Sequence, residues 1–388
     1  MNELTIKTHD LQQPPLTQAQ TGLAAPAWNG GGKIWTLLFL LALLTPPFIY
    51  SDDVYRSEQF AKIAALALFA LSIDLVWGYS GLLSLGQGLY FGLGAYAMAY
   101  SLKLQRTALA AGSPLIASPD MPLPDFMEFS RLPQVPAWIA PLIDVYIAIA
   151  VAILLPALVA MLFGFITFRL RIKGVYFSLI TQALIVALYL LVIRAMPYTG
   201  GNVGMVNLNR LEIFGFRFKE DADLYFLNAG ILIVCFLGCA LLMNSKFGRI
   251  LTAIRDNENR VMALGYNPAL YKTFIFTLAG ALAGLAGALY VAANHSAGPK
   301  FLQVDFSIIA VIWVAVGGRG TLLGAILGAY VVEFGKILIS EQWASVWTII
   351  LGALFITVVL FLPDGIVGLL RNISQFAMKR LGRTKQTV

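Results

Sequence analysis

Five polar side chains lie inside long apolar stretches of this sequence, where each must find a hydrogen-bonding partner. Asp74 is the most costly, because a carboxylate in apolar surroundings is stable only when it faces other polar groups. Ser84, Gln87, Thr181 and Gln182 carry hydroxyl or amide groups that both donate and accept hydrogen bonds. Such groups line a path for a polar solute or a proton, or they join neighbouring helices. We predict the first role and keep the second as the alternative.

Side chains that form catalytic or metal centres are not grouped in the sequence. His9 and His295 are the two histidines, and neither has a second histidine, a cysteine or clustered carboxylates at metal-ligand spacing. The glycines at positions 86, 88 and 92 superficially match a nucleotide-binding pattern, but no strand precedes them. No glycine-rich loop is followed by Lys and Ser or Thr. We therefore expect a protein that is not an enzyme, binds no ATP itself and needs no metal or other cofactor.

The elements that must position the five polar residues are long apolar runs. Hydrophobic residues make up 59% of the chain and charged residues 12%, a balance typical of proteins surrounded by lipid. A helix needs about 20 apolar residues to cross a bilayer, whereas barrel strands would show short alternating segments. The sequence predicts an all-α membrane protein, a bundle of about ten transmembrane helices. The expected spans are residues 34–50, 60–79, 82–102, 142–168, 175–196, 224–243, 273–293, 306–316, 322–339 and 346–362.

Three of these regions are rich in glycine, at residues 78–94, 280–287 and 317–328. Small residues four apart let helix backbones approach closely, and glycine also permits broken or re-entrant segments that line a polar cavity. Close packing is the simpler interpretation, but Ser84 and Gln87 favour a cavity lining in the first region. The pairs with this spacing are Gly88/Gly92, Gly280/Gly284, Gly320/Gly324 and Gly324/Gly328.

Lysine and arginine indicate which loops face the cytoplasm. With ten spans and both termini inside, all three basic clusters lie on the cytoplasmic side. The membrane is expected to be the inner (plasma) membrane. The net charge of +7 is then a signal of topology and does not indicate binding to nucleic acid. We expect a disordered tail at residues 1–33, a transmembrane domain at 34–370 and a basic tail at 371–388. The clusters are Arg169, Arg171 and Lys173; Lys246, Arg249, Arg255, Arg260 and Lys272; and Arg371, Lys379, Arg380, Arg383 and Lys385.

Two long loops have distinct compositions. Residues 103–141 contain seven prolines and are expected outside, as an ordered cap or docking surface. Residues 244–272 are expected in the cytoplasm and combine charges with apolar residues at helical spacing, which predicts one short amphipathic helix ending near Gly265. Such a helix lies on the lipid surface or docks in a groove of a soluble partner, and both alternatives stay open.

Three motifs in this order resemble the LivM-like permeases of branched-chain amino acid and urea-type ATP-binding-cassette importers, over about residues 60–370. They are GYSGLLSLGQGLYFGLGAYAMAY at 78–100, AIRDNENRVMALGYNPALYK at 253–272 and IWVAVGGRGTLLGAILGA at 312–329. Within that family, PDFMEF at 124–129 and RVMALGYNP look like the urea-transport branch.

The resemblance implies an importer built from several subunits in the lipid bilayer. Its expected parts are this chain, a sister permease subunit, two cytoplasmic ATP-binding subunits and an external substrate-binding protein. The segment that matches the family's coupling loop implies contact with an ATPase through Arg255, Asp256, Glu258, Leu264 and Gly265. The alanines that usually follow the acidic residue are absent here.

The resemblance to the urea-transport branch implies urea as the substrate. The expected absence of buried basic residues near residues 78–94 also favours urea, because a neutral solute needs only neutral donors and acceptors. Branched-chain amino acids are the main alternative, since their carboxylate would favour an arginine or a helix terminus. A secondary transporter, with Asp74 as its ion site, and a passive channel are the rival classes.

Overall fold

The computed structural model describes residues 54–116, 121–172, 174–213, 215–218, 221–343, 347–361 and 365–369. Within these ranges the chain is helical apart from loops and one small hairpin, in which β1 (Glu212–Ile213) pairs with β2 (Phe216–Arg217). The expected all-α class is therefore confirmed. The expected span at 34–50 and the expected tails at 1–33 and 371–388 lie outside the described residues.

Helices occupy nine of the ten expected segments. Six of them are long and apolar enough to cross a membrane by length and composition. These six are α3 (Val54–Asp74) with the π-helix η1 (Leu75–Tyr79), α6 (Val145–Arg169), α7 (Val175–Arg194), α9 (Asp221–Asn244), α12 (Pro268–Asn294) and α14 (Leu322–Trp343). The other three are α4 (Gln87–Ala110), α13 (Val304–Gly317) and α15 (Trp347–Phe361).

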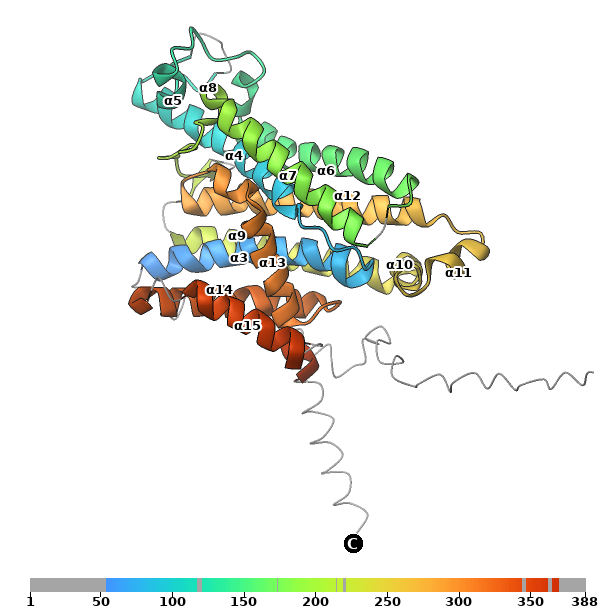
Figure 1. Cartoon of the computed structure of the whole chain (residues 1–388). Helices are drawn as coiled ribbons and strands as arrows, with labels where there is room; N and C mark the ends of the chain where they lie inside the picture. The colour runs from blue at the N-terminus through green and yellow to red at the C-terminus, as the bar shows by residue number, and fades with distance from the viewer. Residues whose placement is uncertain are drawn as a thin grey trace, which may run out of the picture.

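The bundle is built around α3 and α12. Helix α12 packs against α6, α4 and α3, while α3 also packs against α9 and α14. Figure 1 shows these helices running side by side, with α10 (Lys246–Asp256) and α11 (Glu258–Ala263) at one end and α5 (Asp125–Phe129) and α8 (Met196–Thr199) at the other. Since α6 and α7 expose many apolar side chains, the outside of the bundle is an apolar surface suited to contact with lipid.

Close packing of small residues holds the central helices together. A side chain on Gly94 of α4 would meet the carbonyl oxygen of Gly284 of α12, and one on Gly284 would meet the carbonyl of Ala152 of α6. The packing interpretation therefore holds for residues 280–287. It fails for the pair Gly320/Gly324, because Gly320 lies in the α13–α14 loop with φ +75° and is not part of a helix.

The first glycine-rich region is broken as well as tightly packed. Helix α3 ends in the π-helix, residues 80–86 have no regular structure, and α4 begins at Gln87. The expected span beginning at residue 82 is thus wrong at its start. The glycines and polar residues of this stretch allow the backbone to leave the helix, and the spacing of apolar residues does not show where it does so.

Helix α4 also continues to Ala110, so the expected loop at 103–141 begins eight residues too early. Lys103 is buried, and its charge is paired. Its ammonium group lies 2.7 Å from the Asp125 carboxylate and donates to the Val206 carbonyl at 2.9 Å. These partners allow a charged residue of α4 to be buried within the bundle. The remainder of the loop contains α5 and the 3-10 helix η2 (Ala140–Ile143).

The loop at 244–272 forms two short helices and not the single helix that the pattern predicted. Helices α10 and α11 meet at Asn257, whose extended backbone ends the first helix and whose side chain accepts a hydrogen bond from the Arg260 N–H at 3.0 Å. Asn257 is thus the N-cap of α11. Asn267 caps α12 in the same way, followed by Pro268 at its first position.

The contact of Gly284 with α6 predicts a clear stability effect. Gly284→Val should push α12 away from α6, because the added carbons would overlap the Ala152 carbonyl oxygen and the Pro156 ring, at a cost of about 1–3 kcal/mol or more. The apparent Tm of the detergent-solubilised protein should fall by several degrees. Gly230→Val on α9 is the matched control, since a Cβ there meets no other atom within 4 Å. An unchanged Tm for Gly284→Val would contradict the packing described here.

Candidate functional site

The end of α3 leaves main-chain carbonyl groups without helical partners inside the bundle. The last carbonyls of any helix lack such partners, and in an apolar interior each unpaired one is costly. The Val76 carbonyl is satisfied locally, since it accepts hydrogen bonds from the Ser80 hydroxyl at 2.5 Å and the Leu82 N–H at 3.1 Å. The next two carbonyls depend on groups from elsewhere in the chain.

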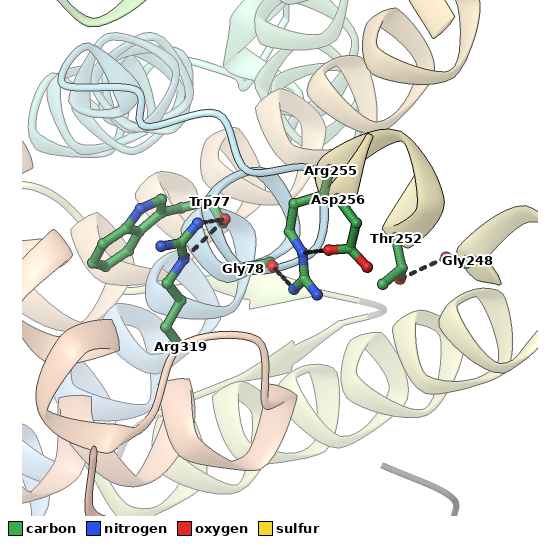
Figure 2. A network of polar contacts seen from close by, with 7 residues as sticks. All are labelled: Trp77, Gly78, Gly248, Thr252, Arg255, Asp256 and Arg319. Carbon is green, nitrogen blue, oxygen red and sulfur yellow. Dashed lines mark hydrogen bonds and ion pairs between the residues drawn. The ribbon is translucent and has the colours of Figure 1, made fainter. Parts of the chain in front are cut away.

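Two arginines from distant segments bind these carbonyls (Figure 2). Arg319, in the α13–α14 loop, donates to the Trp77 carbonyl from Nε and Nη2 at 3.3 and 3.2 Å. Its guanidinium also lies 4.9 Å from the centre of the Trp77 ring, a cation–π distance. Arg255 of α10 donates from Nη1 to the Gly78 carbonyl at 2.7 Å. Positive charge at a helix C-terminus also opposes the helix dipole favourably.

Asp74, the last residue of α3, is fully buried and belongs to the same junction. One carboxylate oxygen accepts a hydrogen bond from the Gly320 N–H at 2.7 Å. Its other oxygen, Oδ2, is buried without a partner among the described residues. The expected burial is confirmed, and the contact with Gly320 is of the structural kind that the sequence left open as the alternative.

Helix α7 holds the middle of the irregular segment. Ser178 donates its hydroxyl to the Leu83 carbonyl at 2.7 Å, and the Leu85 N–H donates to the Thr181 hydroxyl oxygen at 3.2 Å. The structure thus brings Thr181 to this segment as a support for its backbone. Gln182, one residue further round α7, is only half-buried.

Ser84 and Gln87 lie within the supported segment and keep their own polar groups free. Ser84 is 4% exposed and Gln87 is 0% exposed. The Ser84 hydroxyl and both polar atoms of the Gln87 amide have no hydrogen-bond partner among the described residues. The adjacent backbone is satisfied, since the Gly88 N–H donates to Ser307 of α13 at 3.0 Å. A buried primary amide with unused donors and acceptor is costly unless it serves a ligand or water.

The sequence missed the two cations at this site. We expected no basic residue near residues 78–94, and that expectation is wrong, because Arg255 and Arg319 reach Gly78 and Trp77. An arginine between glycines in a short loop connecting two apolar segments was the available signal for Arg319. Its partner lies 242 positions away in the chain, so no local pattern could identify it.

The five residues expected to contact an ATPase divide into two groups. Asp256, Leu264 and Gly265 are exposed, and Leu264 has 72% of its surface accessible. Arg255 and Glu258 instead turn inward, towards the Gly78 carbonyl and towards Lys272 of α12, whose ammonium lies 2.9 Å from the Glu258 carboxylate. The inward pair fastens the two short helices to the bundle, and the exposed group is left at its surface.

Gly265 ends α11 through a left-handed turn with φ +88°. The Gly265 N–H donates to the Met262 carbonyl at 2.9 Å and the Tyr266 N–H donates to the Val261 carbonyl at 3.3 Å. This is the hydrogen-bond pattern of a Schellman cap, which favours glycine at this position. The glycine therefore fixes the direction in which Leu264 is presented.

A groove of about 380 Å³ lies beside α11. Its lining includes Phe165 and Arg169 from α6, Met262 from α11, and Leu270 from the first turn of α12. The surface at this end of the bundle thus combines exposed apolar side chains with positive charge.

Fold and site together define a helical membrane protein with a polar, irregular segment buried inside its bundle. Among the described residues, no group of three His, Cys, Asp or Glu side chains could hold a metal ion. Residues 56–359 match the family model described as "Branched-chain amino acid transport system / permease component". The chain belongs to this family, and as a permease component it is one part of a larger transport system.

The individual relatives have low sequence identity to this chain, but the matches cover half of its length or more. The high-affinity branched-chain amino acid transport system permease protein LivM of Escherichia coli (strain K12) is 23% identical over 368 residues, covering 88% of this chain and 77% of the relative. The probable LivM of Methanocaldococcus jannaschii is 23% identical over 322 residues, covering 77% and 89%. The ribose import permease protein RbsC of Escherichia coli (strain K12) is 26% identical over 210 residues, covering 50% and 60%. No solved structure matches this chain.

The contact of Thr181 with Leu85 predicts a local effect. Thr181→Val removes the acceptor and leaves a buried N–H unpaired, which costs about 1–3 kcal/mol and should speed amide exchange in residues 80–86 at least about fivefold. Hydrogen–deuterium exchange with mass spectrometry measures this. Thr277→Val on α12 is the control, because its hydroxyl binds only the Thr273 carbonyl of its own helix. Equal exchange in both variants would show that α7 does not hold the segment.

Proposed function

We propose that this chain is the permease subunit of an ATP-binding-cassette importer and that it forms, with a sister permease, the translocation path for urea. Separate cytoplasmic ATPases would drive the movement, and an external binding protein would deliver the substrate. The protein would lie in the inner (plasma) membrane with both termini in the cytoplasm, as the basic clusters favour.

The observation that carries this proposal is the pair of unused polar side chains at residues 84 and 87. The Gln87 amide offers two donors and an acceptor, and the Ser84 hydroxyl offers one of each. Urea presents a carbonyl and two amino groups without net charge, which these neutral groups can match. The irregular backbone between Ser80 and Gln87 is of the kind tolerated at membrane depth when it lines a cavity.

Branched-chain amino acids are the second candidate substrate, favoured by the family description and by the LivM relatives. The guanidinium groups of Arg255 and Arg319 lie next to the same segment and could neutralise a carboxylate. Both groups already donate to main-chain carbonyls, which is why we place the neutral substrate first.

We further propose that α10 and α11 face the ATPase in the cytoplasm. The chain has no phosphate-binding loop of its own, so ATP must act from a partner. Exposed Leu264, positioned by the Gly265 turn beside the groove lined by Met262 and Leu270, gives a soluble partner an apolar contact.

Gln87→Leu should reduce urea uptake without reducing membrane abundance. Leucine has nearly the same volume but no polar groups, and losing about two hydrogen bonds at about 1 kcal/mol each lowers the initial rate at least about tenfold. The measurement is uptake of labelled urea, and in parallel labelled leucine, into proteoliposomes that hold the whole importer and ATP. Gln303→Leu, at an exposed position before α13, is the matched control.

Each outcome of this assay has a clear meaning. Normal uptake by Gln87→Leu would return residues 78–94 to a packing role. Uptake of leucine and not urea would select the second substrate. Uptake without ATP would identify a channel, and uptake driven by an ion gradient would identify a secondary transporter.

Leu264→Asp should abolish co-purification with the ATPase subunits. A charge at the centre of an apolar contact loses its hydration, so association should weaken by at least about tenfold. Gly265→Val should act similarly, because a branched residue is strained at φ +88° and would redirect Leu264. Val203→Asp is the matched control, since Val203 is also 72% exposed but lies in the loop after α8, at the other end of the bundle. If both variants still co-purified with the ATPase subunits, Leu264 would not be a docking residue and Gly265 would not orient it.

A further inference from the structure

We propose that Arg255 is a positioning residue that transmits movement of α10 and α11 to the segment carrying Ser84 and Gln87. It would do so through its hydrogen bond to the Gly78 carbonyl, while Arg319 holds the neighbouring Trp77 carbonyl in place. This inference rests on the proposed function, because it supplies the physical connection between the ATPase-facing helices and the solute path.

Arg255 joins α10 to the end of the π-helix η1, two elements that pack against each other. It is the next-to-last residue of α10, so it lies two positions before the break at Asn257 that separates the two short helices. Its guanidinium reaches the Gly78 carbonyl at 2.7 Å, and its Nε lies 3.1 Å from the neighbouring Asp256 carboxylate. The side chain is only 16% exposed, so it is held among other groups and not free in solvent.

The aliphatic part of Arg255 lies against Gly81. A Cβ at position 81 would approach the Arg255 Cγ to 2.8 Å, and Gly81 itself has φ +76°. The arginine therefore touches the segment at two points, at the end of the π-helix and at the first residues beyond it. A displacement of α10 cannot leave this part of the backbone unchanged unless both contacts break.

The residue before Gly78 is anchored to a different element. Arg319 holds the Trp77 carbonyl and stacks on the Trp77 ring, and the adjacent Gly320 N–H binds Asp74. Gly78 leaves no room for a side chain, since a Cβ there would overlap the Gly320 backbone. The α13–α14 loop thus fixes the end of α3.

Two neighbouring carbonyls are consequently held by two different elements. Movement of α10 relative to the α13–α14 loop must be absorbed immediately after Trp77, where Gly78 and Gly81 have no Cβ to restrict φ and ψ. The next residues lead to Ser84 and Gln87 within one short irregular stretch. A small shift at the cytoplasmic helices would then reorient the free hydroxyl and amide groups.

The alternative is that Arg255 only caps the end of α3. A cap would contribute to stability but would leave the response of the path to ATP unchanged. The test therefore reads the environment of residue 84 directly, in the whole importer, with Cys235 and Cys239 replaced by alanine and Ser84→Cys as the single reporter thiol. Its rate of reaction with a small thiol reagent is compared without nucleotide and after ATP and vanadate have been added, which traps ADP and vanadate on the ATPases.

With Arg255 present, trapping is expected to change the reaction rate of the thiol several-fold. Arg255→Gln should bring the ratio of the two rates to unity, while the ATPases stay bound and continue to hydrolyse ATP. Arg255→Lys, which keeps the charge and one donor, should restore part of the ratio. Arg249→Gln, on the exposed side of the same helix, should leave the ratio unchanged.

A full response in Arg255→Gln overturns the proposal, and so does an absent response in an assembled Arg255→Lys variant. If Arg255→Gln does not assemble, the lysine variant decides alone: a retained response supports the proposal and a lost one overturns it. This readout is independent of the substrate, so failure to transport urea would refute the proposed substrate and leave this test intact. Loss of all ATPase association in the unmodified chain would instead refute the proposed function.

Discussion

The site depends on how the bundle satisfies the main-chain carbonyls at the end of α3. This helix end packs among other helices, where main-chain carbonyls without partners are costly, and protein groups pair them. Val76 is paired by residues that follow it directly, whereas Trp77 and Gly78 need Arg319 and Arg255 from other segments. Once these bonds form, the chain can leave the helix and run irregularly to Gln87.

Close packing is the condition that makes this pairing possible. Gly320 donates to Asp74 and lies directly against Gly78, with no space for a side chain on Gly78. The same physical property serves a different purpose in the centre of the bundle, where Gly94 and Gly284 bring α4 and α12 into backbone contact. Glycine therefore acts here both as a packing residue and as the means of interrupting a helix.

In the irregular segment, backbone groups are hydrogen-bonded, whereas two polar side chains are not. Its backbone is fixed by Ser178 and Thr181 of α7, while the side chains of Ser84 and Gln87 remain unpaired among the described residues. A rigid backbone with unused polar side chains is what solute recognition requires, because the groups are oriented before the solute arrives. In this structure the backbone held by α7 and the unpaired polar side chains belong to one short stretch.

The sequence by itself determined the helical class, the approximate spans and the turn at Gly265, because lipid requires long apolar runs and a left-handed helix end favours glycine. It identified Asp74, Ser84, Gln87 and Thr181 as exceptional, because polar residues in apolar sequence are conspicuous. Only the tertiary structure decided that α4 continues past Lys103, that α10 and α11 are separate, and that two arginines hold α3. Arg255 and Arg319 bind partners 177 and 242 positions away, and contacts across such separations leave no periodic signal in a single sequence.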